Sequence, residues 1–163
     1  MEYACFKKYA KLLSEMNRAV VRGYKAPHKV ILLMSVCELV SDGTFLDNRI
    51  ILSKKLEDTF KELWRKYIDS EEKIKHDSIL EELFKDEQEV YPFKCNIANP
   101  FYHLSREPFW RLEKRDNWRQ RTSWSVSTLR TDFKYAVLDE ELYKLIMDTD
   151  CRNKIFLLLC SMI

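Results

Sequence analysis

The scarcity of glycine most limits what this chain can fold into. Only two glycines, Gly23 and Gly43, occur in 163 residues. Tight β-hairpins usually place glycine where the backbone needs a positive φ angle, so a protein built from many hairpins needs more than two. The sequence therefore predicts a mainly α-helical fold with a small β element.

Length and composition are those of one globular domain. Apolar residues make up 46% of the chain and aromatic residues 13%, which is enough for a core and too much for a disordered tail. No repeat or linker divides the sequence, so residues 1–163 are interpreted as a single domain. No signal peptide and no apolar run long enough for a membrane span is found, and the five cysteines have no metal-binding spacing. We expect a cytoplasmic protein without a cofactor, a metal or a membrane partner.

Apolar periodicity predicts two helices in the first quarter of the chain. The first is expected over residues 2–21 and ends before Gly23. Its apolar stripe would consist of Tyr3, Phe6, Ala10, Leu13, Met16 and Val20. Pro27 is expected to open a second helix, because a proline in the first turn loses no hydrogen bond. The nearly unbroken apolar run 30–40 predicts that this helix is the buried centre and ends at Gly43.

The middle of the chain predicts a strand and a third helix. Residues 48–52 are typical of a short strand, and Ser53 can cap the helix that follows. The inward side of that helix is expected to hold Leu56, Phe60, Leu63, Trp64 and Tyr67. The acidic segment 69–89 predicts a short exposed helix around Ile79, Leu80, Leu83 and Phe84.

Prolines change the pattern between residues 91 and 124. Segments 101–105 and 109–113 are predicted to be the two strands of a hairpin. The last third returns to helical periodicity, with helices predicted at 127–136, at 139–147 behind a cap from Asp139, and at 152–162. The middle helix is expected to bury Leu142, Leu145 and Ile146.

Charge is distributed unevenly along the chain. Residues 1–37 hold seven Lys and Arg against two Asp and Glu, and residues 91–130 hold eight against three. The segment between them, 38–90, holds nine against fifteen. If the two basic segments lie together, they form a basic face of the kind that binds phosphate backbones.

Motifs for catalysis are missing from the sequence. Three histidines, His28, His76 and His103, do not form a metal-binding or nucleophile motif, and no glycine-rich phosphate loop is present. Glu107 and Glu113 flank Trp110, and they are interpreted as solvated surface carboxylates. We therefore expect no catalysis by this chain.

The start of the second predicted helix is a candidate anion site. His28 and Lys29 fall in its first turn, where free N–H groups and the helix dipole favour negative charge. Arg22 and Lys25 precede them and add two cations. The alternative is that His28 only helps to cap the helix.

A second candidate region is residues 99–112, where proline and aromatic residues adjoin basic ones. Pro100, Tyr102 and His103 are the candidates to face a ligand, while Phe101, Leu104 and Trp110 are expected in the core. Phosphate contacts are expected from Lys25, Lys29, Arg106, Arg111, Arg115, Arg119 and Arg121. Trp118 and Trp124 have no assigned place.

Four motifs in a fixed order resemble the sulfur-binding domain of type IV, phosphorothioate-dependent restriction endonucleases, which usually precedes an HNH nuclease domain. They are Ala-Pro-His-Lys (26–29), Asn-Arg-Ile-Ile-Leu-Ser-Lys-Lys-Leu with Phe-Lys-Glu-Leu-Trp (48–64), Pro-Phe-Tyr-His-Leu with Phe-Trp-Arg-Leu (100–112), and Ser-Thr-Leu-Arg with Tyr-Ala-Val-Leu-Asp-Glu-Glu-Leu-Tyr (127–143). The resemblance covers nearly the whole chain.

The resemblance implies a bacterial defence protein that binds double-stranded DNA in which a sulfur atom replaces one non-bridging phosphate oxygen. It implies that Pro100 forms an apolar cup for the sulfur and that His28 and Lys29 contact the DNA. Family members often have Tyr before this proline, and this chain has Asn99. Either Tyr102 supplies the ring surface instead, or the preference for sulfur is weaker.

Three further hypotheses stay open at this stage. The domain could read unmodified or otherwise modified DNA, it could bind a protein partner through its aromatic segment, or it could cleave DNA itself. A nuclease subunit is an expected partner under the leading hypothesis.

Overall fold

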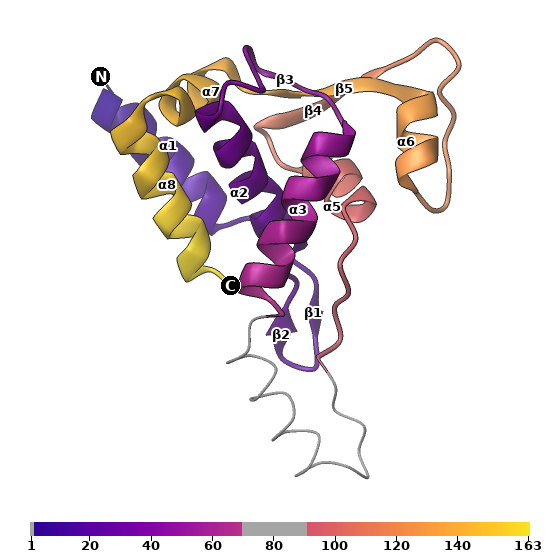
Figure 1. Cartoon of the computed structure of the whole chain (residues 1–163), viewed down its shortest axis with the longest axis horizontal. Coiled ribbons are helices and arrows are strands. Elements are labelled where there is room, and N and C mark those ends of the chain that lie inside the picture. Colours follow the sequence, from indigo (N-terminus) through magenta and orange to yellow (C-terminus); the bar gives the residue numbers. More distant parts are fainter. Residues whose placement is uncertain (1, 70–90) are drawn as a thin grey trace, which may run out of the picture.

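The computed structural model describes residues 2–69 and 91–163, and it is mainly helical with two small sheets (Figure 1). Its helices are α1 (Glu2–Ser14), α2 (His28–Ser41), α3 (Lys54–Tyr67), α5 (Ala98–His103), the 3₁₀ turn η1 (Leu104–Arg106), α6 (Val126–Asp132), α7 (Glu140–Met147) and α8 (Thr149–Ser161). Its strands are β1 (Val20–Val21), β2 (Tyr24–Lys25), β3 (Arg49–Ile50), β4 (Trp110–Lys114) and β5 (Phe133–Leu138). The helix expected around residues 79–84, and His76, lie outside the described residues.

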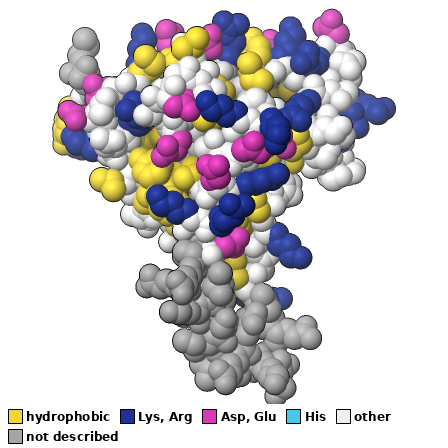
Figure 2. All heavy atoms as spheres, viewed as in Figure 1, with side chains coloured by type: hydrophobic (Ala, Val, Ile, Leu, Met, Phe, Trp, Pro, Cys, Tyr) yellow, Lys and Arg dark blue, Asp and Glu magenta, His cyan; other side chains and the backbone are white. Residues whose placement is uncertain are grey.

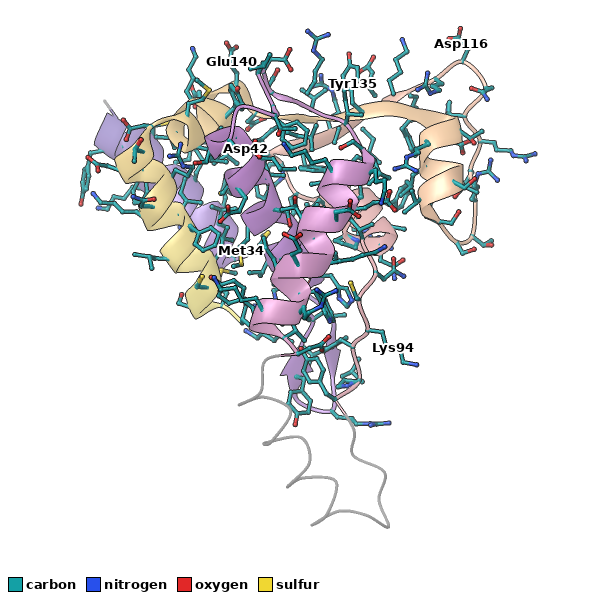
Figure 3. All side chains as sticks on the ribbon, in the orientation of Figure 1. Met34, Asp42, Lys94, Asp116, Tyr135 and Glu140 are labelled. Atoms are coloured by element: carbon teal, nitrogen blue, oxygen red, sulfur yellow. The ribbon has the colours of Figure 1, made fainter. Side chains whose placement is uncertain are left out.

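Helix α2 is the centre of the core, as its apolar run predicts. It packs against α3, α5, α7 and α8, and every residue from Val30 to Cys37 is buried. Met34 lies at the middle of this packing and is 0% exposed (Figure 3). Pro27 occupies the N-cap, and Gly43, with φ of +84°, follows the C-cap Asp42. The positive φ is the left-handed conformation that favours glycine after a helix.

Helix α1 is shorter than predicted, which changes the role of Gly23. The helix ends at Ser14, and the chain then forms the antiparallel pair β1–β2. Arg22 and Gly23 connect the two strands with φ of +53° and +82°, as a two-residue hairpin turn with two positive φ angles requires. Tyr3 and Val20 are exposed, whereas Tyr9, outside the predicted stripe, is 1% exposed.

Helix α3 confirms its predicted start. The Ser53 side chain accepts a hydrogen bond from the Leu56 N–H, and Leu56, Phe60, Leu63 and Trp64 are buried. Helix α7 buries Leu142, Leu145 and Ile146 as predicted. Asp139 holds the N-cap position of α7 without capping it, because its carboxylate accepts a hydrogen bond from the Tyr9 hydroxyl at 2.9 Å.

The predicted hairpin over 101–113 is wrong in its first half. Residues 98–103 form α5, because Asn96 Oδ1 accepts hydrogen bonds from the N–H groups of Ala98 and Asn99 and so caps the turn. Pro100 lies in that first turn, where its missing N–H costs nothing. Residues 110–114 are a strand, as predicted, and Trp110 is buried.

The predicted helix over 127–136 divides into α6 and β5. Its N-terminal half is helical behind a capping box of Ser125 and Thr128. From Tyr135 to Leu138 the side chains alternate between half-buried and buried, and β5 pairs antiparallel with both β3 and β4. This central strand holds the sheet at one end of the helical core (Figure 1).

Candidate functional site

A cavity of about 450 Å³ lies where the start of α2, the segment before the β1–β2 hairpin, and α5 meet. Its lining residues are Asn17, Arg18, Ala19, Ala26, His28, Lys29, Phe93, Asn99, Pro100, His103 and Arg106. The two candidate regions of the sequence therefore converge on one space, although about 70 residues separate them along the chain. Helices α2 and α5 are in direct contact, which fixes this arrangement.

One part of the cavity wall is apolar. Pro100 is buried in the first turn of α5, and Phe93 lies on the extended segment that leads into that helix. Ala19 and Ala26 add small side chains to the lining. These four side chains form an apolar surface, which can contact a weakly hydrated group without replacing hydrogen bonds.

His28 is held by its neighbours more than its sequence position suggests. Its Nε2 atom lies 2.7 Å from the Lys94 carbonyl oxygen, which can only accept, so the ring carries a proton on Nε2. The ring packs 4.8 Å from that of Trp64 and 5.7 Å, edge to face, from that of Phe93. Burial lowers the pKa of His28 below its usual value, so it is neutral at pH 7. The Lys94 side chain points away from the protein body (Figure 3).

Lowering the pH from 7 towards 5 is expected to destabilise the protein through His28. A histidine with a lowered pKa in the folded state takes up its proton more readily when unfolded, so stability is present above about pH 6.5 and is lost as the pH falls below it. Urea unfolding at several pH values, for the wild type and for His28→Gln, measures this. The variant should lose less stability across the window, and parallel curves would contradict the assignment.

Lys29 and Glu107 form an ion pair beside the cavity. Lys29 Nζ donates to Glu107 Oε1 at 3.0 Å and to the Asn17 carbonyl oxygen at 2.6 Å, while the Asn17 N–H donates to the same Glu107 oxygen at 2.9 Å. The side chains of Lys29 and Glu107 are 11% and 10% exposed. The interpretation of Glu107 as a solvated surface carboxylate is therefore wrong, because this side chain joins the end of η1 to α2 and to the connection between α1 and β1.

His103 lines the cavity and carries a ring nitrogen without a hydrogen-bond partner among the described residues. Its Nδ1 is buried, and no partner for it is found in the described parts of the chain. Burial, together with the positive charges of Arg106 and Lys29, lowers the pKa of His103, so the ring is neutral at pH 7. Arg106, one turn further along, is exposed. A buried polar atom without a partner costs free energy of folding.

Six of the nine predicted binding residues line the cavity, and three do not. The six are His28, Lys29, Asn99, Pro100, His103 and Arg106. Arg22 and Lys25 lie on the β1–β2 hairpin. Tyr102 stacks on Trp124 with ring centroids 4.6 Å apart, so it belongs to a different aromatic cluster. The lining also contains the hydrocarbon ring of Phe93, a residue that the sequence motifs did not indicate.

The charges of the lining favour an anion. Arg18, Lys29 and Arg106 are cationic, and Glu107 offsets one of them. Arg18 Nε is tied to the Ala26 carbonyl oxygen at 2.8 Å. In residues 2–69 and 91–163, no group of three or more His, Cys, Asp or Glu side chains could hold a metal ion. A search of the same residues found no helix with the length and apolar character to cross a membrane.

Comparison of the sequence with known protein families and with curated proteins found no match in either case.

Proposed function

We propose that this domain reads double-stranded DNA that carries a phosphorothioate, with the sulfur-bearing phosphate in the cavity between α2 and α5. It would serve a bacterial restriction or defence system, and a nuclease on another domain or chain would cleave the DNA. The observation that carries the proposal is the meeting of cations, a histidine with an unpartnered ring nitrogen and an apolar wall in the lining of one cavity.

The cations and the imidazole account for the anionic part of the ligand. Arg106 is exposed and can pair with a phosphate, and Lys29 adds a second positive charge to the same lining. His103 is neutral, and with its proton on Nδ1 it donates a hydrogen bond to a phosphate oxygen. Such contacts to the DNA backbone give affinity without sequence information.

The apolar wall accounts for the choice of sulfur. Sulfur is larger, more polarizable and less well hydrated than oxygen, so transferring it from water to an apolar surface costs less. Pro100 and Phe93 supply that surface. Asn99, which stands where the resembling family often has Tyr, also lines the cavity, so Phe93 is the aromatic ring available to the sulfur.

The test is to measure the affinity for one duplex with and without a single phosphorothioate, at a stated salt concentration. We expect the wild type to prefer the modified duplex by on the order of tenfold, about 1.4 kcal/mol. Pro100→Ala removes the proline ring, and alanine is compatible with the helix. This variant should therefore lose the preference for the phosphorothioate duplex and keep the affinity for the unmodified duplex.

A matched pair of variants separates the sulfur contact from phosphate contacts. Arg106→Ala should weaken the binding of both duplexes to the same extent and reduce the slope of log affinity against log salt by about one. Lys144→Ala, on α7, should change neither the affinity nor this slope. Equal binding of the two duplexes by the wild type would refute the sulfur claim and favour a reader of unmodified DNA. Absence of binding at low salt would favour a protein-interaction domain.

A further inference from the structure

A second cavity, of about 500 Å³, lies where the connection from β3 to α3 meets α6 and the start of β5. Helix α5 takes part in both cavities, because Phe101 lines the second one while Pro100 and His103 line the first. Within residues 2–69 and 91–163, the two cavities have no lining residue in common. Sites for small molecules commonly measure about 300–1,000 Å³, so the second cavity is large enough for such a ligand.

The lining of the second cavity is basic. Its charged side chains are Lys54, Arg115, Arg130 and Lys134, and no Asp or Glu of the described residues lines it. Arg130 Nη2 lies 2.6 Å from Glu57 Oε2, and Lys54 Nζ lies 3.2 Å from Asp58 Oδ1. Arg115 and Lys134 have no carboxylate partner in the described parts of the chain. Two positive charges are therefore not neutralised, which suits the nearly double negative charge of a phosphate monoester.

Arg115 is exposed, but its head group is held in place. Its Nε–H donates to the carbonyl oxygens of Arg130 and Phe133, at 3.2 Å each, and its backbone N–H donates to the Asp132 carbonyl oxygen at 2.8 Å. Neither of its Nη atoms has a hydrogen-bond partner among the described residues. The guanidinium presents its N–H donors in a flat fork that matches two phosphate oxygens. A donor that is already oriented loses less entropy when a ligand binds.

Lys134 supplies the second cation without a partner. It is the exposed second residue of β5, between the buried Phe133 and the half-buried Tyr135. In Figure 2, Lys and Arg side chains gather at the right end of the molecule, where Figure 1 places α6 and the beginning of β5. A positive surround of this kind raises the local concentration of anions. We therefore expect Arg115 and Lys134 to hold one phosphate group between them.

The remainder of the lining is largely apolar. Phe101, Leu129 and Phe133 line the cavity and are buried. Ile51, which directly follows β3, is 54% exposed. A flat apolar group placed on Ile51 removes the surface of both from water, which stabilises the complex. A guanidinium such as that of Arg115 also stacks on flat rings.

We propose that the second cavity binds a nucleoside monophosphate, with the phosphate on Arg115 and Lys134 and the base on Ile51. A phosphate alone makes no use of the apolar lining, and an uncharged ring makes no use of the two cations. A nucleotide joins both parts in one molecule. The inference does not depend on the proposed DNA-reading function, because the first cavity is lined by other residues.

Titration of the ¹⁵N-labelled protein with AMP, adenosine and inorganic phosphate, followed by NMR, tests the proposal. We expect AMP to shift the amide signals of residues 51–54 and 133–135 and to bind at least about tenfold more tightly than either fragment. Lys134→Ala removes one charge-assisted hydrogen bond from an exposed position, so it should fold and weaken AMP binding about tenfold. Ile51→Ala should weaken AMP binding about threefold and leave phosphate binding unchanged.

Arg111→Ala is the matched control, since it removes an exposed cation of β4 that does not line the second cavity. It should leave the affinity for AMP unchanged. No shifts of these signals at about 10 mM AMP, or equal losses for Lys134→Ala and Arg111→Ala, overturn the inference. Inorganic phosphate that binds as tightly as AMP also overturns it, because the apolar lining then contributes nothing to affinity.

Competition with a DNA duplex separates the two sources of such a phosphate. If the ligand is a free nucleotide, a duplex added to the AMP-saturated protein leaves the AMP-induced shifts of residues 133–135 in place. Displacement of AMP by the duplex means that the cavity holds a DNA phosphate, which overturns the inference and leaves the proposed function standing. A protein that binds AMP and no duplex refutes the proposed function and supports the inference.

Discussion

Phe101→Ala is expected to lower the free energy of unfolding by about 3–5 kcal/mol. The Phe101 side chain is 1% exposed and packs edge to face on Trp110, with ring centroids 5.5 Å apart. Its backbone carbonyl oxygen accepts the Trp110 indole N–H at 3.0 Å in the interior. Truncation therefore removes the apolar contact and opens a cavity under α5, the helix that carries one wall of the candidate site.

Urea unfolding of three variants measures this effect. Phe101→Leu keeps most of the volume and should cost less than about 1.5 kcal/mol. Leu157→Ala removes an aliphatic side chain that is 67% exposed and should change stability by no more than about 0.5 kcal/mol. A loss for Phe101→Ala as small as that for Leu157→Ala would mean that α5 is not anchored by this side chain.

The sequence predicted those parts of the fold whose signals are local. Pro27 and Ser53 mark the starts of α2 and α3 because each acts on its own helix turn. The run 30–40 has few polar residues, which suffices to identify the central helix. Phe101 and Trp110 were expected in the core from their size alone, and both are buried.

The predictions of secondary structure were wrong where a strand distant in sequence or a capping side chain determines the local conformation. Aromatic residues at 101–105 favour strands in general, but the Asn96 side chain caps a helical turn there. The helical pattern at 127–136 ends at Phe133 because β3 and β4 pair with the chain from there. Neither strand is near it in sequence, so periodicity within a short window contains no sign of the pairing.

The candidate site shows the same division. His28 and Lys29 at a helix start, and Pro100 among aromatics, were identified from short motifs. Glu107 and Phe93 were missed, because their importance comes from residues 78 and 65 positions away, Lys29 and His28. Ion pairs and ring contacts over such separations become visible only once the helices are packed.

Two adjacent residues should change DNA affinity in opposite directions. Arg106→Glu replaces an exposed cation of the cavity by an anion and should weaken binding of any duplex by more than tenfold. Glu107→Gln keeps the oxygen that accepts hydrogen bonds from Lys29 and from the Asn17 N–H, but it removes the charge that offsets Lys29. Glu107→Gln should therefore raise the affinity for DNA about fivefold, which corresponds to about 1 kcal/mol of binding free energy.

Salt provides the mechanistic check on this pair. Two unit charges about 4 Å apart have an interaction energy of about 4 kcal/mol at an effective dielectric constant of about 20. Salt and solvent reduce the part of this energy that appears in a measured affinity. The changes in DNA affinity caused by the two substitutions should therefore be smaller at about 200 mM salt than at about 50 mM, because salt screens contacts to phosphates over this range. Changes of the same direction for Arg106→Glu and Glu107→Gln would show that the cavity does not meet a phosphate. Opposite changes would show that Glu107 sets how much of the Lys29 charge a bound backbone experiences.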